Sequence, residues 1–116
     1  MAQPTTLSPA VQGMIEDCTR DCLTCHIVCL DTAMQALQKE KHDTHHIRTM
    51  LDCSEICQTA AHYMLRNSPF YGSICEVCAQ ICTHCGEMCE KAGLTDPANA
   101  CRACAVSCQN LVHLVP

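Results

Sequence analysis

The residues in this sequence whose type and spacing could do chemistry are its cysteines. They make up 14 of the 116 residues, and neighbouring cysteines within a run lie three or four positions apart. Because residues three and four apart share one face of an α-helix, each run predicts a helix with a stripe of thiols along one side. Thiolates are soft ligands that suit Cu(I), Zn(II) and iron–sulfur clusters. The candidate metal ligands are Cys18, Cys22, Cys25, Cys29, Cys53, Cys57, Cys75, Cys78, Cys82, Cys85, Cys89, Cys101, Cys104 and Cys108.

Helix start and stop signals separate these runs. Ser8-Pro9, Ser68-Pro69 and Asp96-Pro97 each read as an N-cap followed by proline at the first helical position, and Asp43 is a fourth N-cap. Gly93 is typical of a helix C-terminus. The sequence therefore predicts four helices, over residues 9–39, 44–66, 69–92 and 97–114.

An internal repeat relates the two halves of the chain. The pattern Cys18-x3-Cys22-x2-Cys25-x3-Cys29 recurs between Cys78 and Cys89, which predicts two related helical hairpins. Short connections make neighbouring helices antiparallel. We expect an all-α protein, an antiparallel four-helix bundle with a cysteine-lined core. Residues 9–116 would form this single domain, and residues 1–8 a flexible N-terminus.

Composition excludes several classes of function. Only 22 of the 116 residues are Leu, Ile, Val or Phe, so cysteines must supply part of the core. With a net charge of −5 and no basic run, the chain is not expected to bind nucleic acid. It shows no catalytic constellation, which argues against an enzyme. The chain also shows no signal peptide and no membrane-spanning apolar run, so we expect a cytoplasmic protein, in a compartment that keeps thiols reduced.

Alternatives to copper remain open at this point. Disulfides within a stripe are strained, because i,i+4 Cβ atoms lie about 5–6 Å apart and a disulfide prefers about 3.8 Å. A metallothionein-like zinc or cadmium sink would use discrete sites of four ligands. An iron–sulfur protein would show runs such as C-x2-C-x2-C-x3-C-P, which this sequence only partly matches. A thiol redox buffer would use no metal.

Charge balance favours Cu(I) among the metals. A buried thiolate is costly unless its charge is compensated. Exchange of one thiol proton for one Cu(I) leaves the core neutral, whereas a Zn(II) ion on four thiolates leaves a net negative charge. Cu(I) needs only two or three thiolates, which Cys-x3-Cys pairs can supply. We therefore expect multiple Cu(I) ions, about one per cysteine.

The chain resembles the bacterial cytosolic copper storage protein family. The resemblance rests on Cys-x3-Cys pairs along four helices, the absence of a signal peptide, and Asn67-Ser68-Pro69-Phe70 at the central turn, and it covers roughly residues 14–114. It implies a four-helix bundle filled by Cu(I) on all fourteen cysteines, homotetramers, and copper entering at one end. Some relatives continue the cysteine stripe where this chain has Leu111 and Val115.

The stripes also predict that the two ends of the bundle differ. Met14, Met64, Leu111 and Val115 should gather at one end as an apolar plug, with Met14 and Met64 as core filler. The opposite end, with Cys89 and Cys101, should form a mouth. There His46 and Met50 are either entrance ligands for copper or incidental residues that cap the bundle. A second apolar stripe on the first helix is a candidate subunit interface, formed by Leu23, Ile27, Leu30, Met34 and Leu37.

Overall fold

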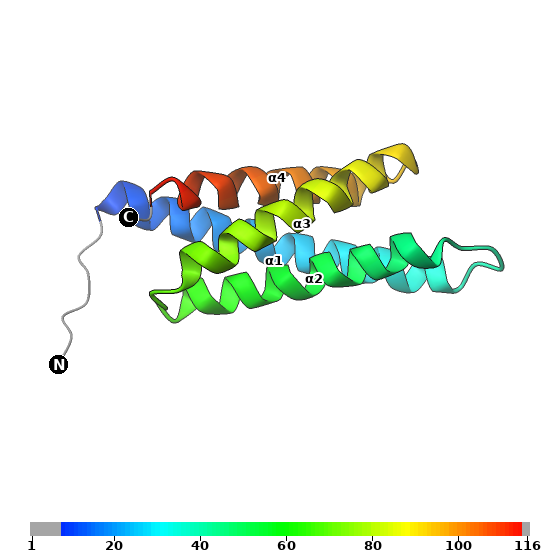
Figure 1. The fold of residues 1–116 in the computed structure, drawn as a ribbon, viewed down its shortest axis with the longest axis horizontal. Helices are drawn as coiled ribbons and strands as arrows, with labels where there is room; N and C mark the ends of the chain where they lie inside the picture. Colours follow the sequence, from blue (N-terminus) through cyan, green and yellow to red (C-terminus); the bar gives the residue numbers. More distant parts are fainter. Residues whose placement is uncertain (1–7, 115–116) are drawn as a thin grey trace.

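The computed structural model describes residues 8–114 and confirms the antiparallel four-helix bundle (Figure 1). Apart from Ser8, the segment expected to be flexible lies outside the described residues, as does Val115. The described residues form helices α1 (Pro9–Leu37), α2 (Thr44–Leu65), α3 (Tyr71–Lys91) and α4 (Thr95–Val112). Each predicted helix is present: α1 and α2 begin at the predicted residues, and the other bounds differ from the predicted ones by one or two residues.

Side-chain caps begin the first two helices as predicted. The Ser8 hydroxyl accepts a hydrogen bond from the Val11 N–H at 3.2 Å, and Pro9 follows at the first helical position. Asp43 accepts from the His46 N–H at 3.2 Å. Each cap satisfies one of the N–H groups that a helix N-terminus leaves without a partner.

The predicted starts of the other two helices are wrong. Ser68 does not cap α3: its hydroxyl accepts from the Phe70 N–H at 3.1 Å and its carbonyl from the Tyr71 N–H at 3.3 Å, so a turn precedes the helix. α4 begins at Thr95, two residues before Pro97. Proline fits there because N–H groups of the first turn have no intrahelical acceptor. Asp96 is thus a first-turn residue rather than a cap.

Two left-handed residues end α2 and α3. Gly93 has a φ of 75° and Asn67 a φ of 54°. The residue after each of them donates a backbone hydrogen bond to the last turns of the preceding helix. Leu94 N–H donates to the Cys89 carbonyl, and Ser68 N–H donates to the Tyr63 carbonyl, both at 2.9 Å. This 6→1 bond is the Schellman motif. Gly93 therefore ends α3 as predicted, and both connections are short enough to reverse the chain.

The four helices form a closed ring around one core. α1 packs against α2 and α4, and α3 packs against the same two neighbours. Polar contacts join the ring outside the core, among them Ser54 on α2, whose hydroxyl donates to the His26 carbonyl on α1 at 2.8 Å. Ser107 on α4 donates to Asp21 on α1. Among residues 8–114, no helix combines the length and apolarity that crossing a lipid bilayer requires.

Small side chains fill the core. All fourteen cysteines are completely buried, and most other buried apolar residues are alanines. The larger fully buried side chains besides the cysteines are Met50 and Leu111. The helices are therefore held together around thiols, which pack as small apolar groups.

Candidate metal centre

The cysteines of all four helices form one buried column along the bundle. None is in a disulfide, so each carries a free sulfur. Helical period places the sulfurs of one helix along a single face, and the ring of helices turns those faces inward. The structure therefore brings together every cysteine that the sequence analysis named as a candidate ligand.

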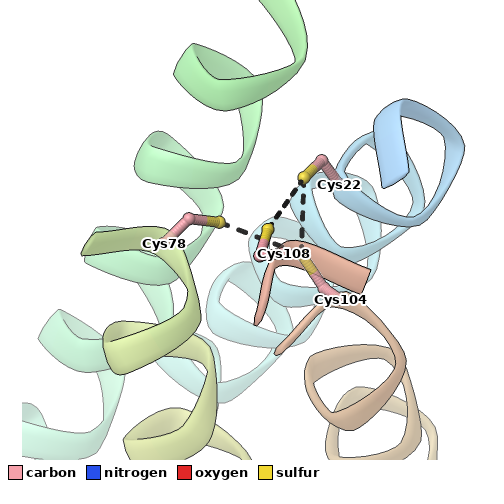
Figure 2. A group of neighbouring side chains, drawn as sticks. All are labelled: Cys22, Cys78, Cys104 and Cys108. Atoms are coloured by element: carbon pink, nitrogen blue, oxygen red, sulfur yellow. Dashed lines mark hydrogen bonds between the residues drawn. The ribbon is translucent and has the colours of Figure 1, made fainter. Parts of the chain in front are cut away.

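Within the described residues, four groups of sulfurs lie close enough to share a metal ion, with all sulfurs of a group within 4.8 Å of one another. Three groups have four cysteines and one has three. Figure 2 shows the first, in which Cys22 from α1 and Cys78 from α3 face Cys104 and Cys108 from α4. The groups are Cys22, Cys78, Cys104 and Cys108; Cys25, Cys57, Cys82 and Cys104; Cys25, Cys29, Cys53 and Cys101; and Cys18, Cys75 and Cys108.

The distances between neighbouring sulfurs suit shared metal ions. Eleven of the fourteen sulfurs lie within 4.0 Å of another cysteine sulfur, and Cys57 and Cys82 are as close as 3.5 Å. With metal–sulfur bonds of about 2.3 Å, two sulfurs on one ion lie about 3.8 Å apart in tetrahedral, about 4.0 Å in trigonal and about 4.6 Å in linear geometry. The metal-free column is thus close to the arrangement that tetrahedral or trigonal ions require.

Contacts between helices dominate this column. In the part of the chain that the structure describes, two Cys-x3-Cys pairs have sulfurs within 4.0 Å, Cys25 with Cys29 at 3.8 Å and Cys78 with Cys82 at 3.9 Å. Most other close pairs join different helices, for example Cys18 with Cys108 at 3.5 Å. Sequence reasoning did not predict these partners, because helical period gives the face of a residue but not the height at which two helices meet.

Hydrogen bonds between thiols set their protonation. Bonding to Cys104, with burial adding to it, raises the pKa of Cys57. Bonding to Cys101 lowers the pKa of Cys25 and of Cys29 to about 6. A thiolate at one position is therefore stabilised by the thiols that remain protonated around it. Because the sulfurs already lie at distances that fit a shared ion, metal ions could replace these protons with little movement of the sulfurs.

The mouth of the bundle lies at the C-terminal ends of α1 and α3. His46 Nε2 is 3.4 Å from the Cys89 sulfur, and His46 is buried. Hydrogen bonds from Cys101 and Cys85, followed by His46, lower the pKa of Cys89 to about 3. Met50 is buried in the same part of the core. The structure thus places His46 beside a thiol that favours its anionic form.

The opposite, closed end carries the predicted apolar side chains. Leu111 is completely buried, Met64 is 3% exposed, and Met14 is half-buried against the core. The Met64 sulfur also lies 3.9 Å from the sulfur of Cys75. That contact was not predicted, since sequence analysis assigned Met64 to core filling alone.

The second apolar stripe of α1 faces outward. Ile27 is 63% exposed, and Leu30, Met34 and Leu37 are exposed as well, while Leu23 is half-buried against the core. The four exposed side chains follow one another along the helix surface. Histidines off the thiol stripes lie outside the column: His26 contacts the Ser54 hydroxyl at 2.8 Å, and His62, His84 and His113 are exposed.

Known proteins share this sequence pattern and this fold. The sequence profile of the copper storage protein family matches residues 10–113. An uncharacterized cysteine-rich protein of Bacillus subtilis (strain 168) is 36% identical over 89 residues, which cover 77% of this chain and 74% of the relative. A crystal structure of a Nitrosospira multiformis protein superposes with a TM-score of 0.84 at 35% identity, covering 88% of this chain and 97% of that one. A mutant of the Streptomyces lividans protein Ccsp superposes with a TM-score of 0.82 at 28% identity, covering 90% and 96%. The chain therefore belongs to the copper storage protein family.

Proposed function

We propose that this protein stores or sequesters Cu(I) in the cytoplasm, bound to cysteine thiolates in the bundle core. The observation that carries this proposal is the column of fourteen buried free thiols, eleven of which lie within 4.0 Å of another cysteine sulfur. Fixed helices hold the ligands, and burial keeps the bound ion away from water and from competing thiols. Such a protein needs no catalytic turnover.

Charge supports Cu(I) as the cargo and about one ion per cysteine as its number. No lysine or arginine is buried beside the column to balance thiolates, since Thr19, His46, Thr49 and Ser54 are the buried polar residues among those described. A monovalent ion that replaces one proton at each thiol keeps the column neutral. A divalent ion on four thiolates would leave negative charge where solvent cannot screen it.

Cu(I) would enter through the mouth. His46 Nε2 and the Cys89 sulfur are already 3.4 Å apart, so an ion held between them has one ligand at the surface end and one in the column. Met50 adds a buried thioether nearby. Both side chains are soft or borderline donors that can pass Cu(I) inward.

The exposed stripe of α1 supports assembly into a homo-oligomer, and the family resemblance implies a tetramer. Contiguous apolar surface of this kind commonly marks an interface between subunits. Burial of Ile27, Leu30, Met34 and Leu37 against a second copy would remove them from water. Light scattering of the wild-type chain tests this, and a monomer at micromolar concentration would exclude it.

A zinc or cadmium sink is the second candidate. It is favoured by the three groups of four cysteines, because four thiolates are the complete ligand set of a tetrahedral divalent ion. These groups share Cys25 and Cys104, so not all three can fill independently. A divalent sink would therefore saturate at a few ions.

An anaerobic titration separates the two. Reduced apo-protein receives Cu(I) in the presence of a chromophoric Cu(I) chelator of known affinity. We expect the chelator to stay uncoloured until about one ion per cysteine has been added. Saturation at only a few ions, or a chelator that takes the first addition, would reject copper storage. The same titration with Zn(II) and a zinc chelator is the matched control.

A further inference from the structure

The closed end of the column contains a sulfur that is not a thiol. Met64 on α2 is 3% exposed, and its Sδ atom lies 3.9 Å from the sulfur of Cys75 on α3. On the α1 side, the Thr19 hydroxyl lies 3.7 Å from the same Sδ atom and donates to the Ile15 carbonyl at 2.8 Å. The thioether is therefore held between α1 and α3 with its sulfur against the thiol column.

The thiol group at this end lacks a ligand from α2. Cys18, Cys75 and Cys108 come from α1, α3 and α4. The nearest cysteine of α2 is Cys57, seven residues before Met64 and thus about 10 Å away along the helix axis. Met64 stands where α2 passes the last three thiols. The separation of 3.9 Å between its sulfur and Cys75 is close to the roughly 3.8 Å expected for two sulfurs on one tetrahedral ion with bonds of about 2.3 Å.

The chemistry of a thioether suits this position. Methionine sulfur is a soft ligand, like thiolate, but it is neutral. It can add a bond to Cu(I) without adding negative charge beside Leu111, which is completely buried. A fourth cysteine here would instead bring another proton or thiolate into the apolar end.

We propose that Met64 Sδ is a copper ligand that completes a terminal Cu(I) site with Cys18, Cys75 and Cys108. This inference rests on the proposed function, because it assigns a ligand within the same store. The bundle then has methionine and thiolate ligands at its closed end, and the last ion of the column is bound there without contact with solvent.

X-ray absorption at the selenium edge tests the proposal directly. Protein labelled with selenomethionine is loaded with Cu(I) to saturation. Met50 near the mouth is removed as a source of signal by Met50→Leu, a substitution of similar volume that cores tolerate. We expect copper in the first shell of selenium in this variant, and its loss when Met64→Leu is added. Met14→Leu in the same background is the matched control and should keep the signal.

The outcomes separate this proposal from the proposed function. If the Met50→Leu protein takes up about one Cu(I) per cysteine but shows no selenium–copper contact, the Met64 site is wrong and storage stands. If the wild-type protein does not retain Cu(I) against the chelator, storage itself fails. The first result needs only a protein that keeps Met64, so it holds even if Met64→Leu fails to fold. If Met64→Leu folds and keeps the signal, the ligand is another methionine.

Discussion

The two ends of the bundle terminate the same thiol column in opposite ways. At the mouth, the buried residues next to the column on α1 and α4 are small, Ala33 and Ala98, and the imidazole of His46 contacts the last thiol, Cys89. At the closed end, α4 carries the completely buried Leu111 instead of an alanine, and Met64 is the buried side chain of α2 there, as His46 and Met50 are at the mouth. Under the proposed function, the mouth is the end at which Cu(I) enters and leaves, and the closed end is the one that anchors the fold.

Truncation of the completely buried leucine at the closed end should have the largest effect on the unfolding free energy. Leu111→Ala leaves a cavity beside completely buried neighbours, and such substitutions cost about 2–5 kcal/mol of unfolding free energy. Urea denaturation of the reduced apo-protein measures this loss. The matched control is Leu65→Ala, at a leucine that is 63% exposed and should change stability by less than about 0.5 kcal/mol. Equal effects of the two substitutions would show that Leu111 does not anchor this end.

The mouth end of the bundle is held by close contact between α3 and α4. Substitutions at two glycines test how tight this contact is. A Cβ atom at Gly86 would lie 3.2 Å from Cys101 Cβ and 3.7 Å from the Ala98 carbonyl oxygen. We expect Gly86→Ala to lower the unfolding free energy by about 1 kcal/mol, because the cost of overpacking exceeds the gain in helix propensity. It should also weaken retention of the copper nearest Cys101, as measured with the chelator.

Gly13 on α1, near the closed end, is the matched control. A Cβ atom there has no neighbour within 4 Å. Gly13→Ala should therefore raise the unfolding free energy by about 0.5–1 kcal/mol and leave copper retention unchanged. If both substitutions raised the unfolding free energy, α4 would be able to move away from Gly86 at no cost. The helices at the mouth would then be packed less tightly than the distances around Gly86 indicate.

The fold and the helix faces that carry the candidate ligands could be predicted from the sequence, because both depend on the spacing of residues along a helix. Cys18 to Cys29 repeat with the helical spacing, and each cysteine is buried as that spacing requires. Helix ends were predicted correctly where a side-chain cap or a left-handed glycine acts alone, as at Asp43 and Gly93. They were correct at Ser8-Pro9 but wrong at Ser68-Pro69 and Asp96-Pro97, since proline is accepted anywhere in the first turn, as Pro97 shows.

Contacts that depend on how helices meet were not predicted from the sequence. The approach of Cys57 to Cys82 at 3.5 Å and of Met64 to Cys75 at 3.9 Å both depend on the relative height of two helices. That height depends on side-chain packing along the whole interface between α2 and α3, and no motif in the chain encodes it. The sequence therefore indicates which residues line the column, and the structure adds which of them could share an ion.

Removal of the imidazole at the mouth should have the smallest thermodynamic effect but a clear kinetic one. His46 is buried but contacts a single thiol, so His46→Ala should lower the unfolding free energy by only about 0.5 kcal/mol and leave the copper capacity almost unchanged. Without the imidazole, an arriving Cu(I) loses its outermost nitrogen ligand, and the Cys89 pKa loses the contribution from His46, although Cys101 and Cys85 still lower it. Stopped-flow transfer of Cu(I) from a weak donor should therefore slow a few-fold, while His45→Ala, at the exposed neighbouring position, should not slow it. Faster transfer in Leu111→Ala, together with unchanged transfer in His46→Ala, would instead place the entrance at the closed end and reverse the comparison between the two ends.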